Sequence, residues 1–311
     1  MRLINNSSTN PHFNIALEEY LLKHTTENIF MLYVDEPSVI VGKHQNTYAE
    51  VNIRFASEKS IKVVRRISGG GTVFHDFGNL NFCFIANGKE GHLVDFKKFT
   101  TPIMEVLLEN DISVVLEGKN DLRVEGFKIS GNAEHVFKNR VLHHGTLLVS
   151  SDLQNLSNIL KVDAEKYTDN AVKSIRSKVA NINQFLKKKI GVEELKNQIF
   201  EHIKQLHSGV FYNLTETDIV EINELITGKF SQWLWNFGYS PRYEFRTKAI
   251  FNNLENDIFL EVENGIIKQA TINHEPQLTN LLIGIEHSPE EIGKLLTMKG
   301  FESEMKWSFF N

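Results

Sequence analysis

Short apolar runs separated by turn residues dominate the chain up to residue 150 and predict the strands of a sheet. Two segments instead repeat apolar residues three and four positions apart, which is the spacing of one helix face. The first helix is expected at residues 10–22, where Asn10 can cap it and Pro11 suits its first position, and the second at residues 99–109. The strands are expected at residues 29–34, 38–42, 61–66, 73–74, 81–86, 113–116, 127–129 and 141–149.

Beyond residue 150 the pattern changes twice. Helices are expected first, at residues 153–160, 192–206 and 215–227. After Tyr239-Ser240-Pro241, strands are expected at residues 243–251, 258–262 and 266–272, with a hairpin turn at residues 263–265. Ser288 can cap a final helix. This mixture predicts an α+β fold with a mostly antiparallel sheet and flanking helices over residues 1–243, and a small separate α+β domain over residues 244–311.

Composition narrows the class of protein. The chain has 311 residues, with 34 Lys and Arg against 39 Asp and Glu, so its formal net charge is −5. This balance argues against a nucleic-acid-binding protein whose affinity depends on a positive field. A hydrophobic content of 41% with 23% charged residues is typical of an ordered globular protein. Cys83 is the one cysteine, which excludes a disulfide framework and a thiolate zinc cluster.

The sequence also bears on location. No apolar run has the length of a membrane span, and the first residues turn polar too early for a signal peptide. We therefore expect a cytoplasmic protein with neither a membrane nor a nucleic acid as its partner.

The most informative motif follows the strand expected at residues 61–66 and reads Arg65-Arg66-Ile67-Ser68-Gly69-Gly70-Gly71-Thr72-Val73-Phe74-His75-Asp76. Three consecutive glycines are costly in backbone entropy and are typical of places where a ligand approaches the main chain. Backbone N–H groups beside two guanidinium groups would bind a carboxylate or a phosphate. The loop matches neither a Walker loop nor G-x-G-x-x-G, so a nucleotide site here needs another architecture. An ordinary turn with solvated arginines is the alternative.

A second motif places Lys128 on a short expected strand between Gly126 and Gly131. Its ammonium group suits a phosphate or a developing oxyanion. Asp121 is a candidate Mg²⁺ ligand, because a hard cation binds carboxylate oxygen and substrate phosphates supply the remaining ligands. Taken alone, either residue could equally be an ordinary surface side chain.

A third motif contains the adjacent histidines His143 and His144 on an expected strand, where neighbouring side chains point to opposite faces. One of them can face a site, but the two cannot share a metal, and no second ligand cluster supports zinc. His75 and Asp76 are a candidate base with its orienting acid, although neighbours on an extended chain rarely pair in this way. Structural roles for these histidines are the alternative.

Together and in this order, the motifs resemble those of the lipoate–protein ligase A family. The resemblance extends over nearly the whole chain, and the joint occurrence of the motifs is specific, whereas a single motif would be weak. Besides the glycine loop, the matching segments are residues 78–82, 120–121, 128–133, 143–148, 173–181 and 235–241.

The resemblance implies the biotin/lipoate ligase fold, with residues 1–243 as the catalytic domain and residues 244–311 as a C-terminal accessory domain. It implies that lipoate and ATP, with Mg²⁺, give lipoyl-AMP, and that the lipoyl group then passes to a lysine of an acceptor. The implied acceptors are the apo lipoyl domains of 2-oxoacid dehydrogenase E2 subunits and the glycine-cleavage H protein.

The resemblance also implies roles for individual residues. Lys128 would be the catalytic lysine, and Asp121 would bind Mg²⁺. The residues implied to bind ATP and the lipoyl-adenylate are Arg66, Ser68, Gly69, Gly70, Gly71, Thr72, Val73, Phe74, His75, Lys128 and His144. Thr72 replaces the alanine of many relatives. The apolar lipoyl tail needs a narrow dry pocket, for which Val73 and Val41 are candidate lining residues.

Two other functions fit the same motifs. An octanoyl or lipoyl amidotransferase of the same fold would take its acyl group from a carrier without ATP. Such relatives commonly use a cysteine nucleophile, whereas Cys83 lies in an apolar strand where a buried, inert thiol is expected. A non-catalytic adenylate-binding relative would keep the pocket without turnover, and the joint presence of Lys128, Asp121 and Arg66 argues against it.

Overall fold

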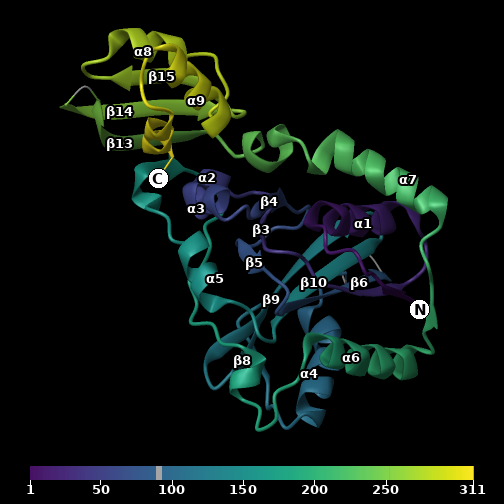
Figure 1. The fold of residues 1–311 in the computed structure, drawn as a ribbon. Coiled ribbons are helices and arrows are strands. Elements are labelled where there is room, and N and C mark those ends of the chain that lie inside the picture. Colours follow the sequence, from purple (N-terminus) through teal and green to yellow (C-terminus); the bar gives the residue numbers. More distant parts are fainter. Residues whose placement is uncertain (89–92, 252, 311) are drawn as a thin grey trace.

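A large mixed sheet forms the centre of the molecule (Figure 1). The computed structural model describes residues 1–88, 93–251 and 253–310. Within these residues the sheet has eight strands in the order β12-β1-β2-β6-β10-β9-β8-β7. β1 pairs in parallel with β2 and β12, and the other neighbours are antiparallel. The strands are β1 (Arg2–Asn5), β2 (Ile29–Tyr33), β6 (Asn79–Asn87), β7 (Val115–Glu117), β8 (Asp121–Val124), β9 (Phe127–Phe137), β10 (Arg140–Leu148) and β12 (Val210–Phe211).

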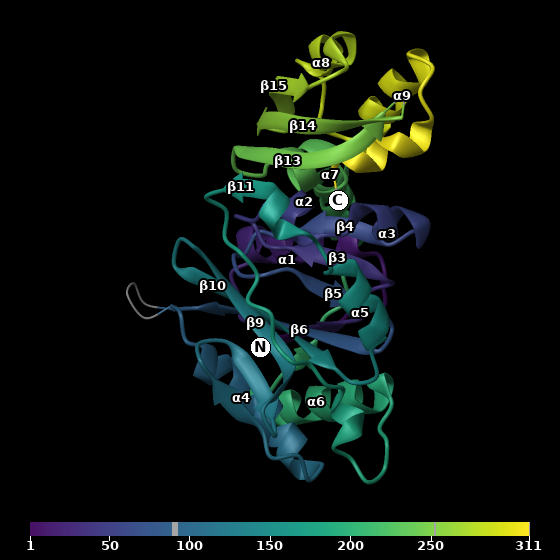
Figure 2. The same cartoon turned by 90° about the vertical axis from the view of Figure 1, so that its left-hand side faces the viewer.

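Helices cover both faces of this sheet (Figures 1 and 2). α1 (Pro11–His24) lies on one face, while α4 (Phe96–Glu109) and α6 (Val192–His207) lie on the other. The alternation of side chains along β6 explains both contacts, because Ile85 packs in the α1 core and Phe84 in the core of α4 and α6. A strand buried on both faces is apolar throughout, as the run from Phe82 to Ile85 is.

A second sheet, β4-β3-β5, lies on the α1 side of the large sheet and supports the glycine loop. β3 (Ser38–Val41) pairs in parallel with β4 (Lys62–Arg65) and antiparallel with β5 (Val73–His75), and the glycine loop joins β4 to β5. The helices around it are α2 (Thr47–Glu50), α3 (Ile53–Glu58) and α5 (Leu153–Ile159).

The C-terminal part forms a third sheet covered by two helices (Figure 1). Its strands follow the order β11-β13-β14-β15, so β11 from the middle of the chain completes the sheet. The core of this part is continuous with Val39 and Phe74 of the second sheet. The elements are β11 (Tyr167–Asp169), β13 (Tyr243–Phe251), β14 (Leu254–Glu263), β15 (Ile266–Ile272), α8 (Pro276–Leu282) and α9 (Pro289–Met298).

The remaining helical segments connect these parts. α7 (Glu216–Leu225) packs beside α1 and leads through two π-helical turns to β13. The short segments are η1 (Ala164–Lys166), η2 (Ile182–Gln184), η3 (Ile226–Phe230), η4 (Leu234–Gly238) and η5 (Ser303–Phe309).

The α+β architecture with a mostly antiparallel mixed sheet is confirmed. The five helices expected before residue 228 are present as α1, α4, α5, α6 and α7, and the Asn10 side chain caps α1 by accepting from the His12 N–H. The Ser288 cap on α9 is also present. The strand expected at residues 127–129 continues to Phe137. The pattern did not predict β1, β8, β11, β12, α2, α3 or α8, because each has seven residues or fewer and shows no periodicity.

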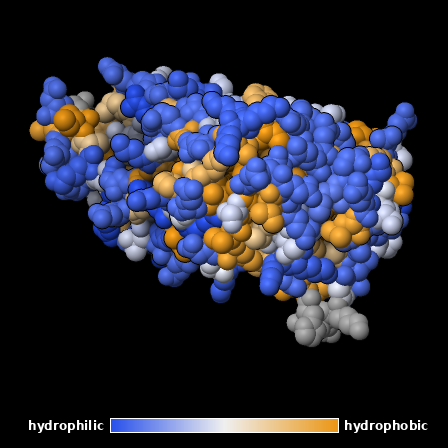
Figure 3. Space-filling model, turned by 90° about the horizontal axis from the view of Figure 1, so that it is seen from below, coloured by the Kyte–Doolittle hydropathy of each residue, from blue (hydrophilic) through white to orange (hydrophobic). Residues whose placement is uncertain are grey.

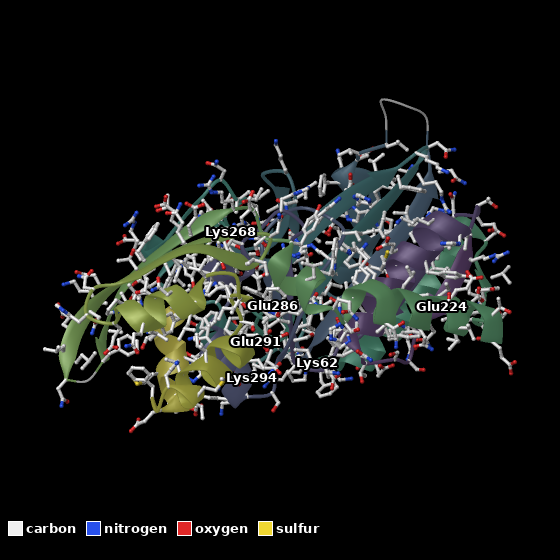
Figure 4. The ribbon with its side chains drawn as sticks, turned by 90° about the horizontal axis from the view of Figure 1, so that it is seen from above. Lys62, Glu224, Lys268, Glu286, Glu291 and Lys294 are labelled. Atoms are coloured by element: carbon white, nitrogen blue, oxygen red, sulfur yellow. The ribbon has the colours of Figure 1, made fainter. Side chains whose placement is uncertain are left out.

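The surface carries mixed side chains. The face seen from below alternates small hydrophilic and hydrophobic patches (Figure 3). On the small C-terminal part, Glu291 and Lys294 lie together on α9, and Lys294 Nζ is 2.8 Å from Glu291 Oε1 (Figure 4). In the described part of the chain, none of the helices is both long and apolar enough to cross a membrane.

Candidate active site

A cavity of about 310 Å³ lies between the large sheet and the glycine loop. Its floor is a row of residues across the sheet, in which Tyr33 pairs with Asn81, Asn81 with Thr146, and Gly131 with Asp121. The Gly131 N–H donates to Thr146 Oγ1 at 3.2 Å and joins the two halves of the row. Residues paired across neighbouring strands point to the same face, so the row shares the face covered by α1.

The two ends of this row differ in chemistry. From Asn81 to Asp121 the row crosses three strand spacings, about 14 Å. Around Asp121 the lining side chains are cationic or polar, because Lys128 and Arg123 pair with its carboxylate and Arg123 also donates to Ser177. Around Asn81 they include Ile15, Tyr33, Ile40, Val73 and His75. The cavity therefore suits a molecule with an anionic head and a mainly apolar tail.

Arg66 holds the glycine loop from within the protein. Its guanidinium group donates to the carbonyl oxygens of Gly69 and Gly71, both at 2.7 Å, and to that of Ile40 at 3.0 Å, while Nε donates to Ser68 Oγ at 2.9 Å. Burial lowers the pKa of Arg66 to about 10, so the group stays cationic at neutral pH. The buried cation fixes the loop conformation and adds positive charge to the cavity wall.

Glycine is required at two positions of this region. Gly70 has a φ of +85°, in the left-handed region that disfavours other residues. A Cβ atom on Gly42 would lie 2.1 Å from the carbonyl oxygen of Gly70. The loop that follows β3 and the glycine loop therefore touch backbone to backbone.

Lys128 is held by Asp121 at the polar end of the cavity. Lys128 Nζ lies 2.8 Å from Asp121 Oδ1, and Arg123 Nη2 donates to Asp121 Oδ2 at 2.9 Å. The Lys128 and Asp121 side chains are 23% and 16% exposed, so a ligand can reach both. A Cβ atom on Gly131 would lie 3.0 Å from Lys128 Nζ, so glycine there leaves room for the ammonium group.

Residues 174–180 close one side of the cavity. Ser174 Oγ accepts from the Thr72 N–H at 2.9 Å and from Gln45 Nε2 at 3.0 Å. The Lys128 N–H donates to the carbonyl oxygen of Lys178 at 2.8 Å. The segment therefore bonds to the glycine loop at one point and to β9 at another.

His144 belongs to a buried chain of hydrogen bonds beside the cavity. Its Nδ1 lies 2.8 Å from Glu18 Oε2 and its Nε2 lies 2.7 Å from Ser68 Oγ. Because the Glu18 carboxylate accepts from Nδ1–H, Nε2 accepts from the Ser68 hydroxyl. His143 points to the opposite face, bonds to Glu134 and packs against Phe82, which confirms the prediction of opposite faces.

His75 does not pair with Asp76. Its Nδ1 lies 2.7 Å from Asp35 Oδ2, while Asp76 accepts from the backbone N–H groups of Gly78 and Asp152. The candidate pair is therefore not formed, as expected for neighbours on an extended chain, since alternating strand side chains separate His75 from Asp76.

The structure brings most of the predicted site residues to one cavity. Ser68, Gly69 and Phe74 are not among its lining residues: Ser68 and Gly69 bond to Arg66 behind the wall, and Phe74 is in the core. Val41 is likewise a core residue, so its assignment to the pocket is wrong. The predicted residues that line the cavity are Arg66, Gly70, Gly71, Thr72, Val73, His75, Asp121, Lys128 and His144.

Several lining residues were not predicted. Tyr33 and Arg123 belong to no motif and reach the cavity only through strand pairing, while Asn81 lies in a matching segment but was not named as a site residue. Ser174 lies in one of the matching segments, but only the fold shows that it contacts Thr72.

Two residues named from the sequence lie away from the chemistry. Arg65 is fully buried and donates to backbone carbonyls, among them those of Gly42 and Trp235, so it joins the second sheet to the segment before β13. Cys83 is buried, and burial raises the pKa of its thiol well above its usual range. Neither side chain lines the cavity.

Whether the site can bind a metal ion depends on which side chains could serve as its ligands. Across residues 1–88, 93–251 and 253–310, no group of three or more His, Cys, Asp and Glu side chains is arranged to hold a metal ion. Asp121 is the one acidic side chain among the described residues that line the cavity. A single carboxylate fits Mg²⁺, which commonly takes one or two carboxylates together with substrate phosphates and water.

Comparison with known proteins identifies the family. Residues 10–204 match the family model described as the lipoyl protein ligase A/B catalytic domain. The chain is 40% identical over 302 residues to lipoate–protein ligase 1 of Staphylococcus aureus, which covers 94% of this chain and 92% of that protein.

Solved structures with the same fold include two ligases. One is the bipartite lipoate protein ligase of Thermoplasma acidophilum, from a study of that ligase and its E2 lipoyl domain, with a TM-score of 0.67, 25% identity and coverage of 76% of this chain and 96% of that chain. The other is a lipoate–protein ligase A bound with ATP, with a TM-score of 0.63, 25% identity and coverage of 76% and 98%.

Proposed function

This chain belongs to the lipoyl protein ligase A/B family, and from that premise we propose that it is an ATP-dependent lipoate–protein ligase. In the first step, a carboxylate oxygen of lipoate attacks the α-phosphorus of ATP, the bond to pyrophosphate breaks, and lipoyl-AMP forms. In the second step, an acceptor lysine amine attacks the carbonyl carbon of lipoyl-AMP, AMP leaves, and the amine loses a proton to form the amide.

The observation that carries the proposal is the charge distribution along the cavity. A carboxylate and a triphosphate repel each other, so the first step needs cations where they meet. Lys128 and Arg123 line the polar end, while Ile40 and Val73 line the other part of the cavity. A mainly apolar acyl chain placed along the floor would bring its carboxylate to these cations.

Lys128 is the proposed catalytic residue. Its ammonium group can stabilise the charge that grows on the phosphate oxygens in the first step and on the carbonyl oxygen in the second. In the ligand-free protein it pairs with Asp121 at 2.8 Å. Because the side chain is flexible and partly exposed, it can exchange this carboxylate for a phosphate oxygen without rearranging the strand.

The other proposed site residues form the cavity wall and fix its conformation. Gly70 and Gly71 line the cavity, where the adenylate can approach their main chain, and Arg66 fixes the loop conformation. His144 lines the cavity and fixes Ser68 behind it.

Mg²⁺ is part of the proposal. Asp121 would hold it together with phosphate oxygens of ATP, since its carboxylate fits the ligands that Mg²⁺ prefers. The ion would supply positive charge to the triphosphate, in addition to the charge that the protein's own cations provide.

We propose lipoyl domains as the acceptors. The Thermoplasma acidophilum ligase, similar in fold over 76% of this chain, was studied with its E2 lipoyl domain. The glycine-cleavage H protein is proposed as a further acceptor on the family resemblance alone. The cytoplasmic location stays a proposal from the sequence.

The structure favours the ligase over the amidotransferase. An amidotransferase that acts through a cysteine needs an accessible thiolate, and Cys83 is 1% exposed with a pKa raised by burial. The retention of Lys128 beside Asp121 in a cavity argues against a non-catalytic relative.

One experiment separates the three functions. Purified protein is incubated with ATP, Mg²⁺, lipoate and an apo E2 lipoyl domain, and the acceptor is weighed by intact-mass spectrometry. Lipoate-dependent exchange of labelled pyrophosphate into ATP measures the first step alone. The ligase gives both exchange and a lipoylated acceptor. In a parallel incubation with an acylated carrier and no ATP, transfer to the acceptor together with absence of exchange would establish the amidotransferase. Binding of lipoyl-AMP without exchange or transfer would establish a binder.

A further inference from the structure

The part of the cavity farthest from Lys128 contains polar groups that an alkyl chain cannot satisfy. His75 and Asn81 line it, and both are almost fully buried, at 3% and 2% exposure. His75 Nε2 has no hydrogen-bond partner within residues 1–88, 93–251 and 253–310. Buried polar atoms are nearly always paired, so an unpaired one in a cavity wall points to a ligand atom or an ordered water.

A buried network fixes these groups in place. Asp35 Oδ2 accepts from His75 Nδ1 at 2.7 Å, and Asp35 Oδ1 accepts from Asn14 Nδ2 at 2.6 Å. Asn81 Oδ1 accepts from Asn79 Nδ2 at 2.8 Å, while Asn81 Nδ2 reaches Asp35 Oδ2 only at 3.5 Å. The imidazole therefore cannot turn to pair Nε2 elsewhere, and the Asn81 amide has a donor hydrogen to spare.

The position of these residues along the cavity floor shows which part of the ligand they would meet. Asn81 lies three strand spacings, about 14 Å, from Asp121, the carboxylate that holds Lys128. A carboxylic acid whose head lies at Lys128 therefore places its tail at Asn81 and His75.

We propose that His75 and Asn81 form a seat for sulfur, which selects an acyl tail carrying sulfur over a hydrocarbon tail of the same shape. The proposal rests on the proposed function, because that function sets which end of the acid lies at Lys128. A hydrocarbon ring at this position removes water from His75 Nε2 and Asn81 Nδ2 and gives them nothing in return.

Sulfur can pair with both groups. A disulfide sulfur is a weak acceptor for Asn81 Nδ2–H, and a thiol S–H can also donate to a ring nitrogen. With the Asp35 carboxylate accepting from Nδ1–H, the neutral imidazole of His75 presents Nε2 as an acceptor. The dithiol form of the tail can therefore use both groups, and the cyclic disulfide uses at least the amide.

The test compares acids with and without sulfur in the tail. Lipoate and its open-chain dithiol form, dihydrolipoate, are set against 5-cyclopentylpentanoate, which has the chain and ring size of lipoate with methylenes in place of both sulfurs. Binding of each acid to the full chain is measured by calorimetry without ATP. We expect dihydrolipoate, whose thiol can donate to His75 Nε2, to bind about ten-fold more tightly than the cyclopentyl acid, because an unsatisfied buried polar group typically costs a factor of this order. Lipoate, which satisfies the Asn81 amide alone, should bind with an affinity between these two. A ratio of dihydrolipoate affinity to cyclopentyl-acid affinity within two-fold of one in the wild type overturns the proposal.

Variants then assign the preference to these residues. His75→Phe is made together with Asp35→Asn, so that no buried carboxylate loses its partner. Asp35→Asn alone is the matched control, and it should keep the wild-type ratio. We expect the ratio to fall below about three-fold in the double variant, through tighter binding of the cyclopentyl acid. An unchanged ratio in the double variant overturns the proposal.

Two further variants guard against a folding artefact. Asn81→Leu removes the amide donor from the same wall and should also lower the ratio. Val73→Ala enlarges the cavity without changing its polar groups, so it should weaken all three acids equally. If the ratio falls equally in Val73→Ala and in Asn81→Leu, the pocket selects the acyl tail by its shape and not by its sulfur. Formation of lipoyl-AMP by the wild type is measured separately, so loss of the proposed function is distinguishable from loss of sulfur selection.

Discussion

Replacing Lys128 by Met tests the assignment at the centre of the proposed chemistry. The change keeps most of the aliphatic stem and removes the ammonium group that lies 2.8 Å from Asp121 Oδ1. Asp121 keeps Arg123 as a partner at 2.9 Å, so no carboxylate is left without a cation. We therefore expect Lys128→Met to fold as the wild type does, with a change in unfolding free energy of about 1 kcal/mol or less, the range of partly exposed ion pairs.

The effect on activity should be much larger. Lys128 is the proposed donor to groups that gain negative charge in both steps, and removal of one such preorganised donor typically costs about 3–4 kcal/mol in the transition state. This corresponds to a rate lower by roughly two to three orders of magnitude in each step. Loss of binding alone would raise KM and leave kcat, whereas loss of a transition-state contact lowers kcat.

Two assays follow the two steps. Lipoate-dependent pyrophosphate exchange reports adenylate formation, and single-turnover transfer from synthetic lipoyl-AMP to an apo lipoyl domain reports the second step. Lys119→Met is the matched control, since Lys119 is an exposed lysine close in sequence that does not line the cavity. Exchange by Lys128→Met within a few-fold of the wild type, at an unchanged unfolding free energy, would refute the assignment.

Three further predictions concern the cavity and the fold. Asp121→Asn should raise the Mg²⁺ concentration that gives half-maximal exchange several-fold, and an unchanged Mg²⁺ titration contradicts its role as the ligand. Gly42→Ala should destabilise the fold by about 2 kcal/mol or more in urea titrations, because its Cβ would lie 2.1 Å from the Gly70 carbonyl oxygen; wild-type stability would show that the two loops separate easily. Burial lowers the pKa of His287 to about 4, below its ordinary value of 6.5, so the unfolded chain takes up a proton first and stability falls as pH drops through this interval. The loss should reach about 3 kcal/mol at pH 4 and should be smaller in His287→Gln, and equal pH profiles of the two proteins would contradict the assignment.

Local features of the chain predicted much of the fold. Helix α1 is evident from its cap, its proline and its apolar face, all of which lie within a few neighbouring residues. The same holds for the glycine loop, whose composition is unusual whatever surrounds it. The strands β1, β11 and β12 show the opposite case, because their pairing partners lie far away in the chain and their own residues are few.

The site residues that belong to sequence motifs could be predicted from the sequence. Lys128 and Asp121 were named together, and the structure places them in contact. The roles of Arg65 and Arg66 were not evident from the sequence. Their motif predicts side chains that bind an anion, whereas both side chains are buried and donate to backbone carbonyls. Asp35 as the partner of His75 was equally hidden, since forty positions separate them and only the pairing of β3 with β5 brings them together.

The strand β11 has a mechanical consequence for the molecule. It leaves the small C-terminal sheet at Asp169, and Ser174, five residues later, is bonded to the Thr72 N–H at the cavity rim. Five residues extend over at most about 17 Å, so Ser174 cannot lie farther than this from Asp169. A shift of the small sheet that draws Asp169 beyond this distance must release Ser174 from the rim, because a single short stretch of chain joins the two.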